Sequence, residues 1–182
     1  MKARQVLWIR LSVYLLAALT LGACSVPRLE DAADMNPVFD PREFFDGKVR
    51  AWGIVQDWRG RLERSFVVDI VGRREGDGII LDEAFLYADG EQDQRTWHIE
   101  PVAPGEFSGR ADDIIGVAEG RARGNALRWR YEMDLEVGKR SYRVHFDDWM
   151  WQLDDSVLAN RSYIRKFGLT VAEVTLFMQR RD

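Results

Sequence analysis

The sequence has little of what most catalytic or metal sites need. Its 182 residues include one cysteine, Cys24, two histidines and five prolines. A single cysteine excludes a disulfide within the chain, so the fold must be held by its hydrophobic core. His98 and His145 lie far apart, and no H-E-x-x-H, cysteine-cluster or G-x-S-x-G motif is present. We therefore expect no metal, no cofactor and no enzyme activity.

The sequence also has no excess of positive charge, with 26 Lys and Arg against 30 Asp and Glu. The formal net charge is −4, which argues against nucleic-acid binding, because such proteins neutralise phosphates with clustered Lys and Arg. Three of the positive charges lie in the first ten residues. Loss of that leader would take the formal charge to −7. A domain of this charge is not expected to dock on anionic lipid by electrostatics.

The N-terminal stretch MKARQVLWIRLSVYLLAALTLGAC joins this basic leader to the apolar run 11–21. The run has the length of a signal-peptide core and falls short of the about 20 apolar residues of a transmembrane helix. It ends in Leu21-Gly22-Ala23-Cys24, which resembles the lipobox of bacterial lipoproteins. We expect residues 1–23 to be a lipoprotein signal peptide and Cys24 to carry the lipid. The alternative is an ordinary secretory signal or an uncleaved anchor.

The lipobox resemblance also implies a location. Ser25 follows the cysteine, instead of the aspartate that retains enterobacterial lipoproteins in the inner membrane. The expected place is the outer membrane, facing the periplasm, with the inner membrane as the less favoured alternative. The acyl chains would make the membrane contact. The sequence does not identify a protein partner.

Residues 24–38 show no sustained period and are expected to form a tether, followed by a single domain over residues 39–182. The stretch ALRWRYEMDLEV at 126–137 alternates apolar and charged residues, which is typical of a strand with one face in a core. Ten such segments are separated by Gly, Asp or Asn turn signals, at 49–58, 62–71, 79–88, 94–100, 107–111, 114–121, 126–137, 141–153, 157–167 and 171–179. They predict an all-β, antiparallel up-and-down, lipocalin-like β-barrel of about 8–10 strands, with a β-sandwich as the alternative.

Several motifs recur in a known order across this domain. They are DPREFFDG (40–47), RTWHI (95–99), GRADDIIGVAEG (109–120), GNAL (124–127), FDDWMW (146–151) and KFGLTVAEVTL (166–176). With the lipobox, they resemble the proteobacterial lipoprotein family known as domain of unknown function 3833. The resemblance implies a lipoprotein with one domain. It implies no catalytic or binding residues.

The strand period places some charged residues on inward faces. Arg64, Glu83, Arg95 and Asp148 share faces with apolar residues, and we expect them to pair with one another and to orient the polar head of a ligand. Gly116, Ala118 and Gly120 remove side-chain bulk from one wall, which suggests room for a small apolar or amphipathic, lipid-like molecule. The side chains expected to line that cavity are Trp97, Trp129, Tyr131, Phe146 and Met150. The alternative is that the charges pair internally and the small residues mark a bend or bulge.

The same strand period assigns faces to the residues of the segment VHFDDWMW at 144–151. His145 and Asp147 share a face and resemble a general base with its orienting carboxylate, but a cross-strand polar ladder on the outer surface is the simpler interpretation. Trp149 and Trp151 also fall on the outer face, where they indicate a covered patch, a lipid contact or a partner site. They motivate the alternative function, an envelope protein that acts through an outer interaction patch.

Overall fold

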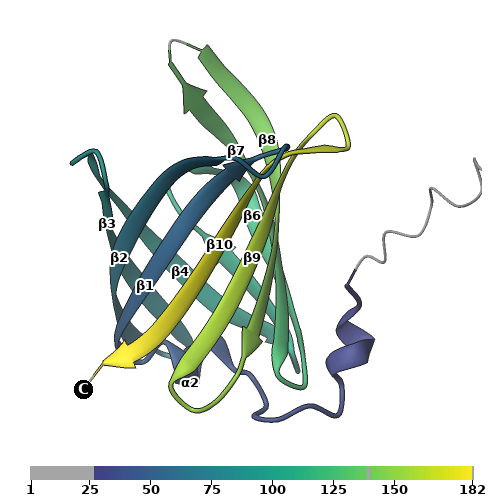
Figure 1. Cartoon of the computed structure of the whole chain (residues 1–182). Helices are drawn as coiled ribbons and strands as arrows, with labels where there is room; N and C mark the ends of the chain where they lie inside the picture. The colour runs from purple at the N-terminus through teal and green to yellow at the C-terminus, as the bar shows by residue number, and fades with distance from the viewer. Residues whose placement is uncertain (1–26, 139, 182) are drawn as a thin grey trace, which may run out of the picture.

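The computed structural model describes residues 27–138 and 140–181. Each strand pairs antiparallel with its neighbours in sequence, and the first pairs with the last to close a barrel (Figure 1). The strands are β1 (Gly47–Asp57), β2 (Leu62–Glu75), β3 (Gly78–Tyr87), β4 (Gln92–Ala103), β5 (Glu106–Arg110), β6 (Ile114–Arg123), β7 (Ala126–Val137), β8 (Arg140–Gln152), β9 (Val157–Lys166) and β10 (Leu169–Arg181). The predicted up-and-down barrel is confirmed, and the sandwich alternative is wrong.

The alternation of apolar and charged residues in the sequence corresponds to the alternation of inward and outward side chains in the barrel wall. Along β7, the side chains of Leu127, Trp129, Tyr131 and Met133 are buried, while the charged residues between them are partly or fully exposed. All ten expected segments are strands whose bounds differ by a few residues from those predicted. The wall is thus built from local hairpins, and the seam between β1 and β10 closes it.

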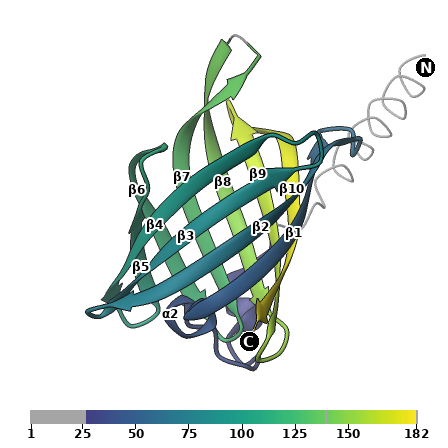
Figure 2. The same cartoon turned by 90° about the vertical axis from the view of Figure 1, so that its left-hand side faces the viewer.

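One end of the barrel is plugged by its own N-terminal residues. The helix α2 (Pro41–Phe44) lies across this end, seen at the bottom of Figure 2. Asp40 caps it by accepting a hydrogen bond from the backbone N–H of Arg42 at 2.8 Å, and the helix begins with proline, which suits the first helical position. Phe44 and the adjacent Phe45 are buried, with their rings 5.1 Å apart edge to face. We call this the closed end.

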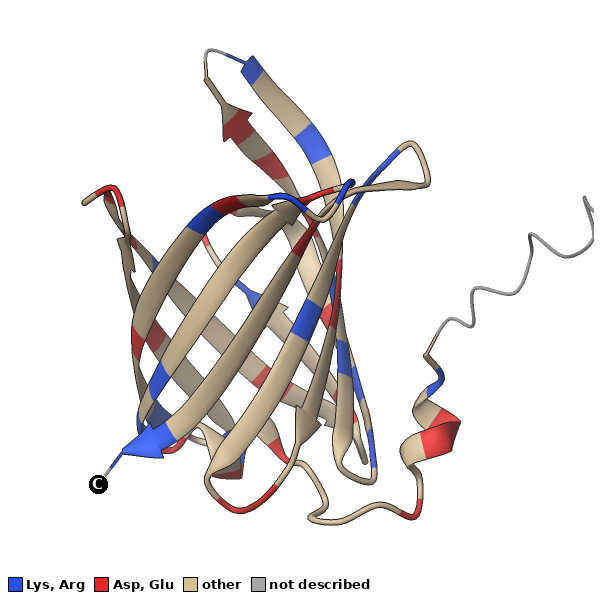
Figure 3. Cartoon of the chain, in the orientation of Figure 1, with Lys and Arg blue, Asp and Glu red and all other residues tan. Residues whose placement is uncertain are grey.

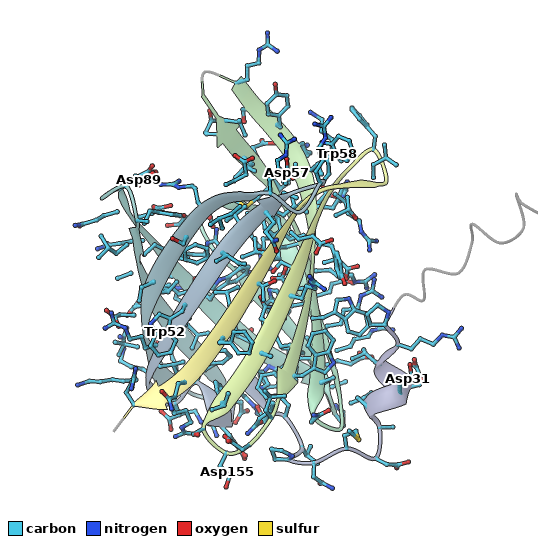
Figure 4. All side chains as sticks on the ribbon, in the orientation of Figure 1. Asp31, Trp52, Asp57, Trp58, Asp89 and Asp155 are labelled. Carbon is cyan, nitrogen blue, oxygen red and sulfur yellow. The ribbon has the colours of Figure 1, made fainter. Side chains whose placement is uncertain are left out.

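The opposite end carries the turns β1–β2, β3–β4, β5–β6, β7–β8 and β9–β10, and we call it the open end. Asp57, Trp58 and Asp89 mark it in Figure 4, and Asp155 marks the closed end. The β7–β8 hairpin projects beyond the rest of the wall at the open end (Figure 1). The two ends therefore differ in what covers them.

The segment before the barrel is not a free tether throughout. Within the expected tether 24–38, a short 3-10 helix, η2 (Leu29–Ala32), packs against the outside of β6 and β7. The backbone N–H of Phe39 donates to the Gly124 carbonyl at 2.8 Å. Gly124 has φ +49, and any Cβ there would overlap the carbonyl oxygen of Ala32. A glycine is therefore needed in the β6–β7 turn for this segment to dock.

The expected signal peptide, residues 1–23, and the lipid-attachment residue Cys24 lie outside the described residues. Within the described part of the chain, no helix is both long enough and apolar enough to span a bilayer.

Candidate functional site

The inward face of the barrel brings together most of the residues predicted to bind a ligand. Trp97 lies edge to face with both Trp129 and Tyr131, at ring distances of 5.6 and 5.3 Å. Tyr131 stacks on Phe146 at 4.8 Å. Met150 packs against the same core from β8. The aromatic side chains thus form a continuous inner wall from β4 to β8.

The small residues of β5 and β6 do not leave the room that the sequence suggested. A Cβ at Gly109 or at Gly120 would overlap the indole of Trp129, so the space is filled by that ring. Gly116 has φ +75 and lies where the β6–β7 register shifts, which is the β-bulge that the alternative interpretation predicted. Gly120 thus makes room for the Trp129 ring, and Gly116 forms a bulge.

The four inward charges do not neutralise one another as expected. Arg64 pairs with Asp89 at 3.0 Å and Glu91 at 2.8 Å in the β3–β4 turn, and its guanidinium lies 3.6 Å over the Tyr87 ring. This arrangement places Arg64 at the rim of the open end. Arg64 forms no ion pair with Glu83 or Asp148 among the described residues.

Arg95 also has a partner that the sequence did not reveal. Its guanidinium pairs with Asp113 of the β5–β6 turn at 2.6 Å. Glu83 is directly opposite Arg95 in the β3–β4 register. No ion pair joins Glu83 or Asp148 to a basic side chain in the described part of the chain. Two carboxylates therefore face the barrel interior with no cation in direct contact.

Asp148 is the more deeply buried of the two. Only 7% of the residue is exposed, and its Oδ1 has no hydrogen-bond partner among the described residues. Burial raises the pKa of Asp148 to about 7, against the opposing effects of the Ser162 hydroxyl and the Arg95 charge. A buried carboxylate oxygen without a partner is costly, because it has lost its hydration and gained nothing in return.

Glu83 shares this environment but is half-buried. Burial raises its pKa to about 7, the Arg95 charge lowers it, and Asp113 and Asp148 raise it further. Burial also raises the pKa of Tyr131 well above its ordinary value, and Asp148 adds to the effect. Glu83, Arg95, Tyr131 and Asp148 are thus one electrostatic group, with more acid than base. We call these four residues the inner polar group.

Water reaches the inner wall from the open end. Several inward-facing apolar side chains there are only partly buried, among them Val55, Phe85, Tyr142, Phe146, Val174 and Leu176. Those near the closed end, such as Val49, Ile79 and Leu158, are almost fully buried. Three hollows described on the molecule all lie outside the barrel wall or at its closed rim. Any interior site is therefore reached through the open end.

The outer face of β8 carries the polar ladder that the simpler interpretation predicted. Asp147 is only 5% exposed and pairs with Arg128 at 2.6 Å and Arg165 at 3.3 Å. His145 pairs instead with Glu132, at 3.2 Å. His145 and Asp147 thus have separate partners. No group of three or more His, Cys, Asp or Glu side chains within residues 27–138 and 140–181 could hold a metal ion.

The predicted outer patch is largely covered. Trp149 is 1% exposed although it faces outward, and it lines a cleft with η2 and its preceding residues. Trp151 is half-buried and stacks on it at 6.2 Å. The covered-patch interpretation is the one that the structure supports. Strand parity was enough to place the two tryptophans on the outer face. No signal in the sequence showed that η2 and the residues before it would cover them.

An exposed apolar groove lies elsewhere on the wall. It runs over β1, β2, β3 and β10, and its outward side chains include Trp52, Ile54, Leu86 and Phe177. Trp52 marks it in Figure 4. Sequence reasoning placed the exposed aromatic surface on β8, because it could not distinguish outward residues that are covered from those that are not.

The comparisons with known proteins agree with this architecture. The profile of the family described as "Protein of unknown function (DUF3833)" matches residues 18–180. A crystal structure of a protein of unknown function from the DUF3598 family, from Nostoc punctiforme PCC 73102, is similar with TM-score 0.60 and 12% identity. The match covers 87% of this chain, which spans only 53% of that protein.

A second solved structure is an S-type phycobiliprotein lyase from Guillardia theta. It matches with TM-score 0.56 and 8% identity, over 78% of this chain and 91% of the lyase. At such identities the likeness shows the lipocalin-like fold alone. No curated protein matches the sequence.

Proposed function

The chain belongs to the DUF3833 family, and on that premise we propose that it binds a small amphipathic molecule inside its barrel while anchored to the outer membrane through Cys24. The apolar part of the molecule lies against Trp97, Tyr131 and Phe146. Its polar end meets the inner polar group. Entry is through the open end.

One observation carries the interior site: the buried, unpartnered Oδ1 of Asp148. Buried polar atoms without a partner are rare in folded proteins, and they are explained by strain, by a bound molecule or by function. A molecule that reaches Oδ1 after a local side-chain movement and donates a hydrogen bond to it would satisfy the atom. The nearby aromatic rings and partly exposed apolar side chains supply the apolar surface that ligand pockets in such barrels use.

The charges of the inner polar group indicate the chemistry of the polar end. Asp113 already neutralises Arg95 at 2.6 Å, whereas Glu83 and Asp148 lack a basic partner in the described residues. A ligand with an ammonium or another hydrogen-bond donor would complement these carboxylates. An anionic head such as a fatty acid would be repelled.

One solved neighbour is named as a phycobiliprotein lyase. A barrel of this fold therefore occurs in a protein that acts on another molecule, which supports a binding role without defining the ligand. The envelope location rests on the lipobox and on Ser25. If Cys24 is lipidated, we expect globomycin to stop cleavage of the signal peptide in cells.

The test is native mass spectrometry of the full chain, extracted from its own membranes in mild detergent. We expect an adduct of small-molecule mass that carries an amine or other donor group. Asp148→Asn keeps the side-chain shape but removes the charge, and we expect it to reduce adduct occupancy about tenfold or more, since a charged hydrogen bond contributes about 1.5–3 kcal/mol.

The matched control is Asp134→Asn on the outer face of β7, where the carboxylate pairs with Arg143 at 3.2 Å. It should leave occupancy unchanged. A chain that is recovered without any adduct, or an adduct that both variants retain equally, would contradict the interior site.

A further inference from the structure

A second candidate site lies outside the barrel, where the N-terminal segment meets the wall. The cleft between η2 and the strands β5–β8 has a volume of about 290 Å³. Arginines from three segments line it, together with Trp149. We call it the arginine cleft, and its basic residues are Arg28, Arg121, Arg123, Arg128 and Arg130. Figure 3 shows the basic positions on the strands beside η2.

The arginine cleft has an excess of positive charge although the chain as a whole is acidic. Three glutamates, Glu30, Glu106 and Glu119, also line it. Glu119 pairs with Arg130 at 3.2 Å. With Asp147, which pairs with Arg128 at 2.6 Å, four carboxylates stand against the five arginines, so the formal excess is one positive charge. Asp31, which lies on η2 (Figure 4), is not part of the lining.

Two of these arginines have no carboxylate partner in the part of the chain that the structure describes. Arg123 donates to the Ala122 carbonyl at 3.1 Å, and no ion pair is formed by Arg123 or Arg28 there. The other three each pair with a carboxylate, Arg128 with Asp147. Arg28 and Arg123 thus offer guanidinium donors that the described residues leave unused.

The side chains that line the cleft decide which chemical group it can bind. Trp149 is 99% buried, it lines the cleft, and its indole Nε1 has no hydrogen-bond partner among the described residues. The Arg128 guanidinium lies 5.0 Å over the same indole ring. An indole N–H can only donate, and so can a guanidinium. A group bound in the cleft must therefore accept hydrogen bonds from the guanidinium groups that line it, and the excess of arginines favours an anion.

The position of the cleft along the chain identifies the source of that anion. Arg28 and Pro27 line it, and Pro27 is three residues from Cys24, a distance of at most about 11 Å for an extended chain. We propose that the arginine cleft binds the phosphates of membrane lipid headgroups, so that the wall of β6, β7 and η2 faces the membrane. This inference rests on the lipidation of Cys24 proposed above. It does not depend on the interior ligand.

The local charge changes the expectation drawn from the whole chain. A net acidic domain is repelled by an anionic surface as a whole, but potentials near contact depend on the nearest charges, because more distant ones are screened beyond about 10 Å. Basic residues at a membrane surface each contribute about tenfold or less in partitioning. Arg28 and Arg123, which form no ion pair in the described residues, would thus orient a chain that the lipid already holds in place.

The test compares lipidated full chain in nanodiscs of phosphatidylcholine alone with nanodiscs in which phosphatidylglycerol replaces part of it. Amide hydrogen exchange is followed in residues 27–32 and 119–130. We expect exchange there to slow on the order of tenfold with the anionic lipid, and this protection to fall at high salt. Exchange at the open end should not change.

The test variant is Arg28→Gln together with Arg123→Gln, which should abolish the difference between the two lipids. The matched control is Arg59→Gln with Arg61→Gln, two exposed arginines of the β1–β2 turn, which should keep it. Equal exchange in both lipids, or an equal loss in the control, would overturn the proposal. So would protection by inorganic phosphate in pure phosphatidylcholine, because the site would then take a free anion.

The intact mass of the same sample separates this proposal from the interior site. A chain without the diacylglyceryl mass would overturn headgroup binding and leave the barrel ligand standing. A chain that shows headgroup protection but no small-molecule adduct would overturn the barrel ligand and leave headgroup binding standing.

Discussion

Asp147 and Asp148 are neighbours on β8 and are almost equally buried, at 5% and 7% exposure, but they lie on opposite faces of the barrel wall. On the outer face, Arg128 and Arg165 compensate Asp147. On the inner face, Asp148 has no ion pair in the described residues and one unpartnered oxygen. Similar burial thus has opposite energetic meaning, because the partners decide whether a buried charge stabilises the fold.

The contrast between Asp147 and Asp148 distinguishes a charge that stabilises the fold from a charge that is available to a ligand. A paired carboxylate in the outer wall fixes the packing of β7, β8 and β9. A carboxylate held without a partner in the interior costs stability, and proteins accept such a cost mainly where a site is needed. Making the same substitution at both positions therefore tests this distinction most directly, because opposite effects on stability are expected.

Asp147→Asn should have the largest effect. It removes the negative charge from a nearly buried ion-pair group and leaves two arginines without their counter-charge, and we expect it to lower the free energy of unfolding by about 3 kcal/mol. Urea unfolding followed by fluorescence measures this. If the variant unfolds at the same urea concentration as the natural chain, Asp147 is not the structural member of the pair.

Asp148→Asn should act in the opposite direction and depend on pH. The pKa of Asp148 is raised from 3.8 to about 7, so the folded state binds the proton more tightly than the unfolded state. Its contribution to stability is fully present below about pH 4 and is lost as pH rises to about 7.

Asp148→Asn removes this pH-dependent loss of stability, because asparagine has no proton to release. In the absence of ligand, it should therefore be more stable than the natural chain at pH 8, by about 2 kcal/mol, and show no such gain near pH 4. Thermal unfolding at the two pH values is the measurement. A variant that is destabilised equally at both would mean that Asp148 belongs to the structure in the way Asp147 does.

Gly120→Ala should have the smallest effect of the three. It places a methyl group against the Trp129 indole, and overpacking of this kind costs about 1–2 kcal/mol. The double variant Gly120→Ala with Trp129→Phe should recover part of the loss, because the smaller ring makes space. Full tolerance of the single change would mean that the Trp129 ring does not fill the space beside Gly120.

Much of the fold could be predicted because it depends on local pattern. The period of two in 126–137 gives both the strand and the face of each residue, and turn residues set the bounds of the hairpins. The docking of η2 could not be predicted, because its determinant is the space above Gly124, a feature of the folded backbone. The short segment itself carries no period that would reveal it.

The candidate site was predictable only in part, for a related reason. Parity placed Glu83, Arg95, Trp97 and Asp148 on the inner face, where the structure has them. It could not show that Asp113, which lies in a turn, would reach Arg95 and leave both carboxylates unpaired. Nor could it show that the Trp129 ring would fill the space of the glycines. Such contacts depend on the distance between strands that are far apart in sequence.

The closure of the wall has a consequence for how the chain is made. Nine pairings join strands that follow each other along the chain, whereas β1 must meet β10 across nearly the whole domain. Local hairpins close at little entropic cost, and the long loop closes last. The barrel is therefore complete only once Leu169–Arg181 has been synthesised. A chain that ends before it leaves β1 and β9 as two bare sheet edges, open to pairing with another copy.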